Sequence, residues 1–559
     1  MNYLDIEQVR QENKQDLQPV IEQALDQLAL AQQQYPGLIM EVVKTGKLEQ
    51  QLDRTYQELD ADLLSNPDGS LAAASGAYFL NEDVFGGSRE TDTLNYLNPI
   101  GKNKVSDWQA MPTKLKLGPG VGYVQAPPIY KDLLCLGLDT PPLTVNYTAP
   151  FGNTETRNGI KALMDSRIDP EKQFFPDNGV FLTEGATEGV DLFMEGIART
   201  KPGSRVVFLG LSYYTGPFSA LQKGLNIERL IANPVQAEEK TKFIPGAQEI
   251  SQSLPSDTSA LLLTAPNNPN GETYDDDQLK EIMKLAKQKD ILILFDCLFE
   301  NMFFDRSQNY QSRLLQIAQA EGALDKVVVV DGLSKTKNFA GERIGFLATT
   351  NTEFASTLTN IVLARRCNPR LTVGPLVLFE GLARKVKTLT SESLQVPLAT
   401  IIDYVLKDQK NPFDRTEFKK MYLKWDDWND QTLRFYEDNL RLTRALLDGS
   451  ITASSPDNAA FNTFVQMSDL EPGTNNMDFL AKLMFTLGTY TQIGPCFGIS
   501  QNFWDNHLGV WPRITYACDR KDLVEALTRL ITFSKFYAEK NFGDPNKFPT
   551  LQISFDRQI

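Results

Sequence analysis

Histidine is almost absent from this chain, since His507 is the only one among 559 residues. Metal centres built mainly from histidine are therefore excluded, and we expect no metal. A conventional Ser-His-Asp site is excluded everywhere except around His507. We weigh two roles for His507, one close to a substrate and one purely structural, and favour the structural role. General acid and base chemistry falls mainly to lysine, aspartate, glutamate, tyrosine or a cofactor.

Cysteine and long apolar runs are also scarce. The five cysteines are scattered and form no CxxC pair. Free thiols of this kind are typical of a reducing compartment, so we expect a cytoplasmic protein. Apolar runs such as residues 260–263 are far shorter than the roughly 18 residues needed to span a bilayer. The first ten residues, MNYLDIEQVR, contain no apolar core of a secretory signal.

Positive charge is in the minority. Lys and Arg together number 56 against 71 Asp and Glu, which gives a formal net charge of −15. A net acidic protein is a poor partner for nucleic acid or for an anionic membrane, and we expect neither. A local basic pocket can still hold a small anion.

The middle of the chain predicts the fold class. Between about residues 150 and 350, apolar β-branched runs alternate with amphipathic runs. This alternation predicts an α/β fold whose mostly parallel sheet is covered by helices on both faces. Helices are expected at 186–199 and 277–288. The predicted strands are Arg205–Leu209, Ile227–Ile231, Ala260–Thr264, Ile291–Phe295, Lys326–Val330 and Ile344–Ala348.

The flanking segments have other patterns. Residues 1–64 are predicted to be helical and polar, and residues 65–145 to be rich in loops. The glycines at 118, 120 and 122 are not interpreted as a phosphate loop, because no strand precedes them and no helix follows. Residues 375–450 are predicted to be helical, with a charged stretch at 407–431 that we interpret as a solvated insertion. Apolar patterning at 462–466, 510–517 and 521–540 predicts a smaller α+β domain.

The most specific motif follows the predicted strand 326–330. It runs Gly332-Leu-Ser-Lys335-Thr-Lys-Asn338-Phe-Ala-Gly341-Glu-Arg343-Ile-Gly345. A lysine just past a buried strand can lose its proton, and a neutral lysine can form a Schiff base with an aldehyde. An arginine eight residues later suits a bidentate phosphate contact. Taken alone, a lysine and an arginine near a strand end are usually part of a solvated turn.

This motif resembles the lysine signature of the class I/II (fold-type I) aminotransferases, which depend on pyridoxal 5′-phosphate. The resemblance implies that Lys335 carries this cofactor as a Schiff base, with Lys337 as the less favoured alternative. It also places Gly332 and Arg343 at the cofactor. An amino acid and a 2-oxo acid are the implied substrates, and a homodimer or larger homo-oligomer is the implied assembly.

Three further motifs resemble the cofactor site of the same family. Asn268, in the run Asn267-Asn-Pro-Asn-Gly271, would donate a hydrogen bond to the 3-oxygen of the cofactor, although turn chemistry alone also explains this run. Asp296 ends an apolar strand and would pair with the protonated pyridine nitrogen; a helix cap is the alternative. The phosphate cup would comprise Gly185, Ala186 and Thr187, where a plain N-cap is the alternative.

The resemblance extends to three more residues. Tyr213 would stack on the pyridine ring, with Tyr214 as the alternative. Tyr147 would reach the cofactor phosphate of the partner subunit. Arg513 would clamp the α-carboxylate of the substrate, because its planar fork matches a carboxylate, and Asn268 is assigned to the substrate as well. We assign direct catalytic roles to Lys335, Asp296 and Tyr213.

Two positions depart from the family pattern. Phe299 stands three residues after Asp296, where relatives usually carry a tyrosine; we keep it as a cofactor contact. Leu363 occupies the position at which relatives that act on dicarboxylates place a second arginine, and Arg365 and Arg366 are out of register. This second departure argues against an aspartate-type clamp.

The predicted organisation has four parts. Residues 1–110 form an N-terminal helical and loop extension, and residues 111–165 belong to the small domain and its lead-in. Residues 166–385 form the large cofactor-binding domain, and residues 386–559 form the small C-terminal domain, with a helical insertion near 400–432. The predicted function is an aminotransferase acting through Lys335. A lyase, decarboxylase or cyclising enzyme that uses the same cofactor is the alternative, and a non-enzymatic regulator is a third hypothesis.

Overall fold

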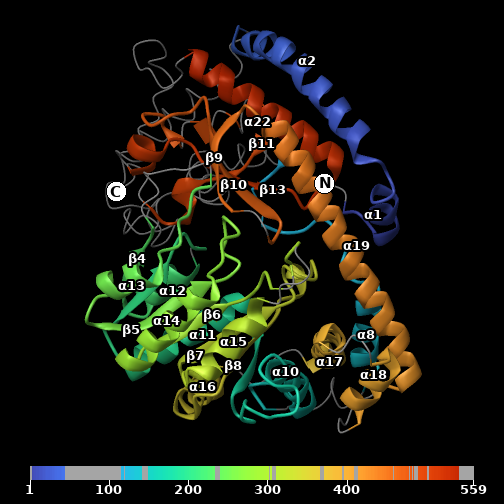
Figure 1. Ribbon diagram of the computed structural model, residues 1–559, viewed down its shortest axis with the longest axis vertical. Coiled ribbons are helices and arrows are strands. Elements are labelled where there is room, and N and C mark those ends of the chain that lie inside the picture. Colours follow the sequence, from blue (N-terminus) through green and yellow to red (C-terminus); the bar gives the residue numbers. More distant parts are fainter. Residues whose placement is uncertain are drawn as a thin grey trace.

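The computed structural model shows two regions, each with its own sheet and helices, that lie one above the other in Figure 1. The described residues are 3–44, 115–118, 120–140, 149–213, 215–232, 240–300, 302–304, 310–365, 371–392, 396–407, 413–456, 459–476, 479–480, 483, 487, 489–499 and 503–540. Two expectations, the helical character of residues 45–64 and the position of Tyr147, therefore lie outside the described residues. No described helix is both long and apolar enough to cross a membrane.

A seven-stranded sheet forms the centre of the larger region. Its strand order is β2-β8-β7-β6-β5-β3-β4. β8 runs antiparallel to β2 and β7, and the other four pairings are parallel, so the expectation of a mostly parallel, helix-flanked sheet is confirmed. The strands are β2 (Val180–Glu184), β3 (Arg205–Leu209), β4 (Asn226–Leu230), β5 (Thr258–Thr264), β6 (Leu292–Asp296), β7 (Val327–Gly332) and β8 (Ile344–Thr349).

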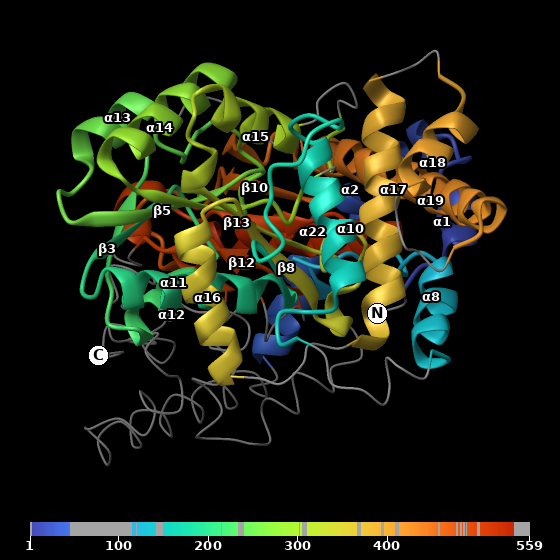
Figure 2. The same cartoon turned by 90° about the horizontal axis from the view of Figure 1, so that it is seen from below.

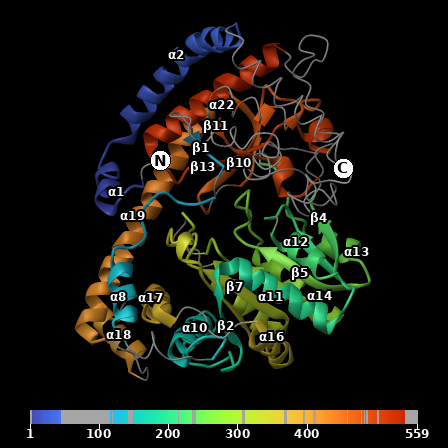
Figure 3. The ribbon, with the colours of Figure 1, turned by 180° about the vertical axis from the view of Figure 1, so that it is seen from behind.

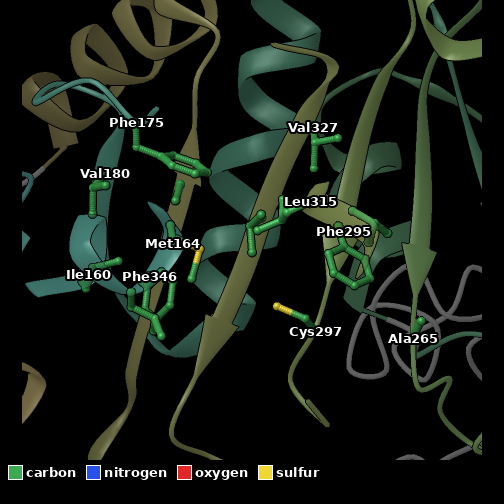
Figure 4. Packing of buried hydrophobic residues seen from close by; sticks show 14 of the residues in the cluster. Ile160, Met164, Phe175, Val180, Ala265, Phe295, Cys297, Leu315, Val327 and Phe346 are labelled. Atoms are coloured by element: carbon green, nitrogen blue, oxygen red, sulfur yellow. The ribbon is translucent and has the colours of Figure 1, made fainter. Parts of the chain in front are cut away.

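Helices cover both faces of this sheet (Figure 2). One face packs against α11 (Gly185–Thr200), α12 (Thr215–Gln222) and α16 (Thr352–Arg365). The other packs against α10 (Thr154–Ser166), α13 (Ala247–Ser253), α14 (Asp276–Lys289), α15 (Tyr310–Ala320) and α17 (Gly374–Glu392). Central strands are apolar on both faces, because alternate side chains enter different helix layers. Figure 4 shows part of the second layer, where Phe295, Leu315 and Val327 pack together.

The smaller region is built around an antiparallel sheet of order β12-β13-β10-β9. Its strands are β12 (Gln492–Ile493), β13 (Pro512–Thr515), β10 (Asn462–Met467) and β9 (Ile451–Ser454). A separate parallel pair joins β1 (Leu115–Lys116) to β11 (Thr489–Tyr490). The remaining helical elements are α8 (Ile129–Leu138), α18 (Leu398–Leu406), α19 (Arg415–Leu447), α22 (Arg520–Lys540), and the short η2 (Leu324–Lys326), η3 (Ala340–Glu342), η4 (Leu371–Val373), η5 (Gly494–Phe497) and η6 (Trp504–Leu508).

The N-terminal part is helical, as expected, and it is packed onto the smaller region. It consists of α1 (Ile6–Glu12), which starts at an Asp5 capping box, and α2 (Leu17–Lys44). Helix α2 lies along the outside of α22 (Figure 3). Arg520 of α22 donates to the Glu12 carbonyl over 3.1 Å, so the two ends of the described chain are bound together.

The interpretation of residues 407–431 as a solvated insertion was wrong. From Arg415 onward this stretch belongs to the long helix α19, which runs from α18 to the smaller region (Figure 3). Phe418, Tyr422 and Trp425 recur at helical spacing and are at most 3% exposed. The charged residues between them occupy the opposite face of the helix. The many charged residues of this stretch led us to overlook the apolar residues that recur at helical spacing along one face of α19.

Helix α11 approaches β8 so closely that only glycine fits at one position. A Cβ atom added at Gly345 would lie 2.5 Å from the Gly185 carbonyl carbon and 2.7 Å from the Ala186 nitrogen. These are backbone atoms, so the helix would have to move away from the sheet. This contact sets the position of the α11 N-terminus relative to the turn that contains Lys335.

We predict that Gly345→Ala lowers the free energy of unfolding by about 1–3 kcal/mol, the usual cost of overpacking. Gly341→Ala is the matched control, because an added Cβ there meets no atom within 4 Å. Urea unfolding of both variants measures the difference. Equal stabilities for the two variants would show that α11 and β8 are not in tight contact.

Candidate active site

A cleft of about 860 Å³, open solvent included, lies at the carboxyl edge of the seven-stranded sheet. Parallel strands bring the residues that follow them to one edge, which is where α/β folds bind ligands. The N-terminus of α11 and the segments after β3, β5, β6 and β7 all reach this cleft. It brings together eight of the residues predicted from sequence: Ala186, Thr187, Tyr213, Asn268, Asp296, Phe299, Lys335 and Arg343.

Lys335 lies in the turn after β7. Its Nζ donates a hydrogen bond to the Gly120 carbonyl oxygen over 2.7 Å. Burial lowers the pKa of Lys335 to about 8, and the positive charges of Arg513 and Arg343 act in the same direction. A larger fraction of this amine than of an ordinary lysine is therefore neutral near physiological pH and is available as a nucleophile or a base.

Asp296 is the last residue of β6, where the register pairs it with Thr264 and Val330. Its Oδ1 accepts a hydrogen bond from the Leu298 N–H over 3.2 Å. Burial raises the pKa of Asp296 to about 6. Among the described residues no cation forms an ion pair with it, so the carboxylate is suited to a cationic group of a ligand.

The first turn of α11 has the features of an anion-binding cup. Backbone N–H groups at a helix N-terminus have no helical partner, and the helix dipole favours negative charge there. Gly185 adopts φ +72°, and a Cβ at this position would lie 2.9 Å from Arg343 Nη2. The absence of a side chain at Gly185 therefore lets Arg343 approach the cup, where it also donates to the Glu184 carbonyl over 3.3 Å.

Arg513 comes from β13 of the smaller region and is 3% exposed. Its Nη1 donates to Asn268 Oδ1 over 2.6 Å, and its Nη2 donates to the Gly118 carbonyl. Its Nε is buried without a hydrogen-bond partner among the described residues. Burial lowers the pKa of Arg513 to about 10. A buried guanidinium held only by neutral acceptors can exchange them for a carboxylate.

Sequence reasoning missed the glycine segment 118–122. The carbonyls of Gly118 and Gly120 accept from Arg513 and Lys335 respectively. A Cβ at Gly120 would lie 3.3 Å from the Arg513 guanidinium. Three glycines within five residues do indicate a close backbone approach. We considered the three glycines only as a phosphate loop. The residues that they approach, Lys335 and Arg513, are far away in the sequence, so no local pattern identifies them.

The comparison with known proteins decides the family. Residues 140–530 match the family model described as aminotransferase class I and II. The chain belongs to this family.

Two relatives of the chain show how far the likeness extends. It is 28% identical over 203 residues to an aspartate aminotransferase of Thermotoga maritima, which is 36% of this chain and 50% of that protein. It is 26% identical over 263 residues to an aromatic-amino-acid aminotransferase of Thermococcus litoralis, covering 46% and 62% of the two chains. The chain therefore spans about half to two thirds of the length of these relatives.

Solved structures agree on the fold. An aminotransferase from Mycobacterium tuberculosis superposes with a TM-score of 0.57 at 19% identity, covering 76% of this chain and 93% of that one. An aromatic aminotransferase from Pyrococcus horikoshii has a TM-score of 0.56 at 18% identity, covering 78% and 99%.

Class I and II aminotransferases in general depend on pyridoxal phosphate, and the cleft residues fit this group. The unpaired carboxylate of Asp296 suits its protonated ring nitrogen, and the α11 cup with Arg343 suits its phosphate. Tyr213 lines the cleft and is 44% exposed. Gly332 lies at the end of β7 opposite Gly345 of β8. Tyr147 and Tyr214 lie outside the described residues.

Two other sequence interpretations concern residues away from the cleft. Leu363 is 56% exposed on α16, and Arg365 forms ion pairs with Asp191 and Glu195 of α11. Neither residue lines the cleft. His507 is exposed, and its ring packs on Phe503 with 4.9 Å between ring centroids. It too lies outside the cleft lining, and its structural role stays a prediction.

Phe299 lines the cleft and is 4% exposed, with its ring 5.4 Å from that of Phe461. A tyrosine here would bring a phenol towards the 3-oxygen of pyridoxal phosphate. Hydrogen bonding to the deprotonated form of a group lowers its pKa.

We predict that Phe299→Tyr shifts the visible pH transition of the cofactor-loaded protein to lower pH. Phe303→Tyr, outside this cleft, is the control and leaves the transition in place; an unshifted transition in Phe299→Tyr contradicts the assignment.

Proposed function

We propose that the protein is a pyridoxal-phosphate-dependent aminotransferase that moves an amino group between an amino acid and a 2-oxo acid. The observation that carries this proposal is Lys335: a buried lysine that lines the same cleft as Asp296 and whose pKa is lowered by burial and by the charges of Arg513 and Arg343. The family membership and the fit of the cleft to the cofactor support it.

Five groups of this chain would hold the cofactor. Asp296 would bind the ring nitrogen, and Asn268 would donate to the 3-oxygen. The α11 N-terminus and Arg343 would hold the phosphate, while Tyr213 would cover one face of the ring. When bound, pyridoxal phosphate supplies an electron sink for the bonding electrons at the α-carbon of the substrate.

Arg513 would orient the substrate. Its guanidinium would exchange the Gly118 carbonyl for the α-carboxylate while Asn268 continues to accept from Nη1. A bidentate contact fixes both the position and the plane of the carboxylate. The buried arginine loses little solvation in this exchange, and it places the α-carbon near Lys335.

Lys335 Nζ would then act as the base. An amine whose pKa is about 8 takes up a proton from the α-carbon and gives it back at neutral pH. The Gly120 carbonyl holds this amine at 2.7 Å, which limits its positions during the transfer.

The assembly and compartment belong to the same proposal. We infer a homodimer or larger homo-oligomer in the cytoplasm. The resemblance of Tyr147 to a residue that reaches the partner's cofactor supports the assembly. The cysteines Cys135, Cys297, Cys496 and Cys518 are free thiols, which supports a reducing compartment.

The proposal predicts transfer of ¹⁵N from a labelled amino acid, drawn from a panel, to added 2-oxoglutarate. Lys335→Ala should lower the rate by about 10²–10⁴-fold or more, because the proton carrier is lost. Lys326→Ala, at the opposite end of β7 and paired with Asp290, is the matched control and should retain activity. Release of ammonia, carbon dioxide or a side-chain fragment in place of labelled glutamate would identify a lyase, decarboxylase or cyclising enzyme instead.

A further inference from the structure

Glu272 is a buried acid that has no part in the proposed chemistry. It follows the turn that contains Asn268, after β5, and is 1% exposed. Its carboxylate accepts hydrogen bonds from the Phe243 N–H over 2.7 Å, from the Ile244 N–H over 2.9 Å, and from the side-chain amide of Asn270. Among the described residues its hydrogen-bond donors are therefore all neutral. Burying a carboxylate without a cation costs free energy, which only a full set of hydrogen bonds offsets.

The two backbone groups that Glu272 binds lie where the chain passes from one region to the other. The Thr241 N–H donates to the Ser454 carbonyl of β9 over 2.9 Å. Phe243 packs in the core of the smaller region, and Ile244, the next residue, packs in the core of the larger region. The carboxylate therefore fixes the backbone at the point where the chain changes from one core to the other.

Phe243 contacts the residues that position Arg513. Its ring centroid lies 5.2 Å from that of Trp511, edge to face, and 5.6 Å from that of Phe464. Trp511 stands two residues before Arg513, and the register of β10 and β13 pairs Phe464 with Arg513. Close-packed aromatic rings leave little room for independent movement, so a shift of Phe243 also shifts the strand that carries the guanidinium.

The turn before Glu272 contacts Arg513 directly. Asn268 Oδ1 accepts from Arg513 Nη1 over 2.6 Å. The Asn267 N–H donates to the Glu272 carbonyl over 2.8 Å, and Asn270 binds the Glu272 carboxylate, so the turn is held as one unit. Glu272 thus bonds at one end to the turn that carries Asn268 and at the other to the backbone of Phe243. These two contacts set the spacing between the Asn268 amide and the Arg513 guanidinium.

We propose that Glu272 is a positioning residue for the substrate: it holds the Asn268 turn and the Arg513 strand at the spacing that lets the guanidinium bind the α-carboxylate. This inference rests on the proposed function, which assigns Arg513 to that carboxylate. Glu272 lies outside the cleft lining, so it acts through other residues. Its loss weakens carboxylate binding and leaves the cofactor contacts of Asp296 and α11 in place.

Binding of ¹⁴C-labelled 2-oxoglutarate to the cofactor-loaded protein, measured by equilibrium dialysis at pH 8, tests the proposal. No amino acid is added, so affinity is measured without turnover. Burial raises the pKa of Glu272 to about 7, so this carboxyl is mostly ionised at pH 8. Glu272→Gln should raise the dissociation constant about tenfold or more, because its amide N–H₂ opposes a backbone N–H and the turn shifts.

Glu249→Gln is the matched control. Glu249 also accepts a backbone N–H, that of Gly246 over 2.7 Å, but it is exposed at the start of α13. Phe243→Leu is a second test variant, which removes the ring contact with Trp511 and leaves the backbone bonds to Glu272. It decides the matter if Glu272→Gln fails to fold, as circular dichroism shows. A purely structural role would lower the melting temperature and leave the affinity of the folded protein unchanged.

We expect weaker binding of 2-oxoglutarate in Arg513→Gln, Glu272→Gln and Phe243→Leu, with wild-type binding in Glu249→Gln and wild-type cofactor content in all four variants. Unchanged binding in Glu272→Gln and Phe243→Leu, together with weaker binding in Arg513→Gln, overturns the positioning role and leaves the proposed function standing. Unchanged binding in Arg513→Gln, or no binding by the wild type, overturns the assignment of Arg513 to the carboxylate and the positioning role with it.

Discussion

Backbone hydrogen bonds between β5, β6 and β7 are the constraint on which the candidate site depends. They hold Thr264, Asp296 and Val330 side by side at one edge of the sheet. Asn268 comes four residues after Thr264, and Lys335 comes five residues after Val330. Groups more than 60 residues apart in sequence therefore share one cleft, because parallel strands end at the same edge.

The smaller region completes the cleft through polar contacts. Arg513 reaches Asn268, and the carbonyls of Gly118 and Gly120 meet Arg513 and Lys335. On the other side of the same turn, Asn338 Nδ2 donates to the Tyr436 hydroxyl of α19 over 2.9 Å. The lysine turn is thus held by both regions. A substrate that displaces one of these contacts acts on the boundary between the two regions.

Burial explains the electrostatics on both sides of that turn. It lowers the pKa of Lys335 and of Lys337 to about 8 and raises that of Asp296 to about 6 and of Glu300 to about 8. Groups whose pKa values lie close to neutrality can change protonation during a reaction or on binding a ligand. The fold achieves this by enclosing lysine and carboxylate groups in a mostly apolar interior.

Much of the larger region could be predicted from sequence, because its central strands are continuous apolar runs between turn residues. β3 begins and ends at the predicted residues, and β5 begins two residues before the predicted strand. β7 begins one residue after the predicted start and ends two residues after the predicted end. Asn268, Asp296 and Lys335 were singled out by their resemblance to family motifs, and each lies at the end of such a strand or within four residues after it. Contacts between distant segments could not be predicted. The many charged residues of α19 made its apolar face hard to recognise. No local sequence pattern relates Gly120 to Lys335 or Glu272 to Phe243.

Reductive trapping of pyridoxal phosphate on the protein with borohydride, followed by tandem mass spectrometry of the digested chain, tests most directly whether Lys335 carries the cofactor. Both Lys335 and Lys337 are lysines with lowered pKa values in one turn, so the measurement must resolve one from the other. We expect the cofactor on Lys335, and we expect Lys335→Ala to take up none covalently. Modification of Lys337, or a protein that retains no cofactor, would contradict it.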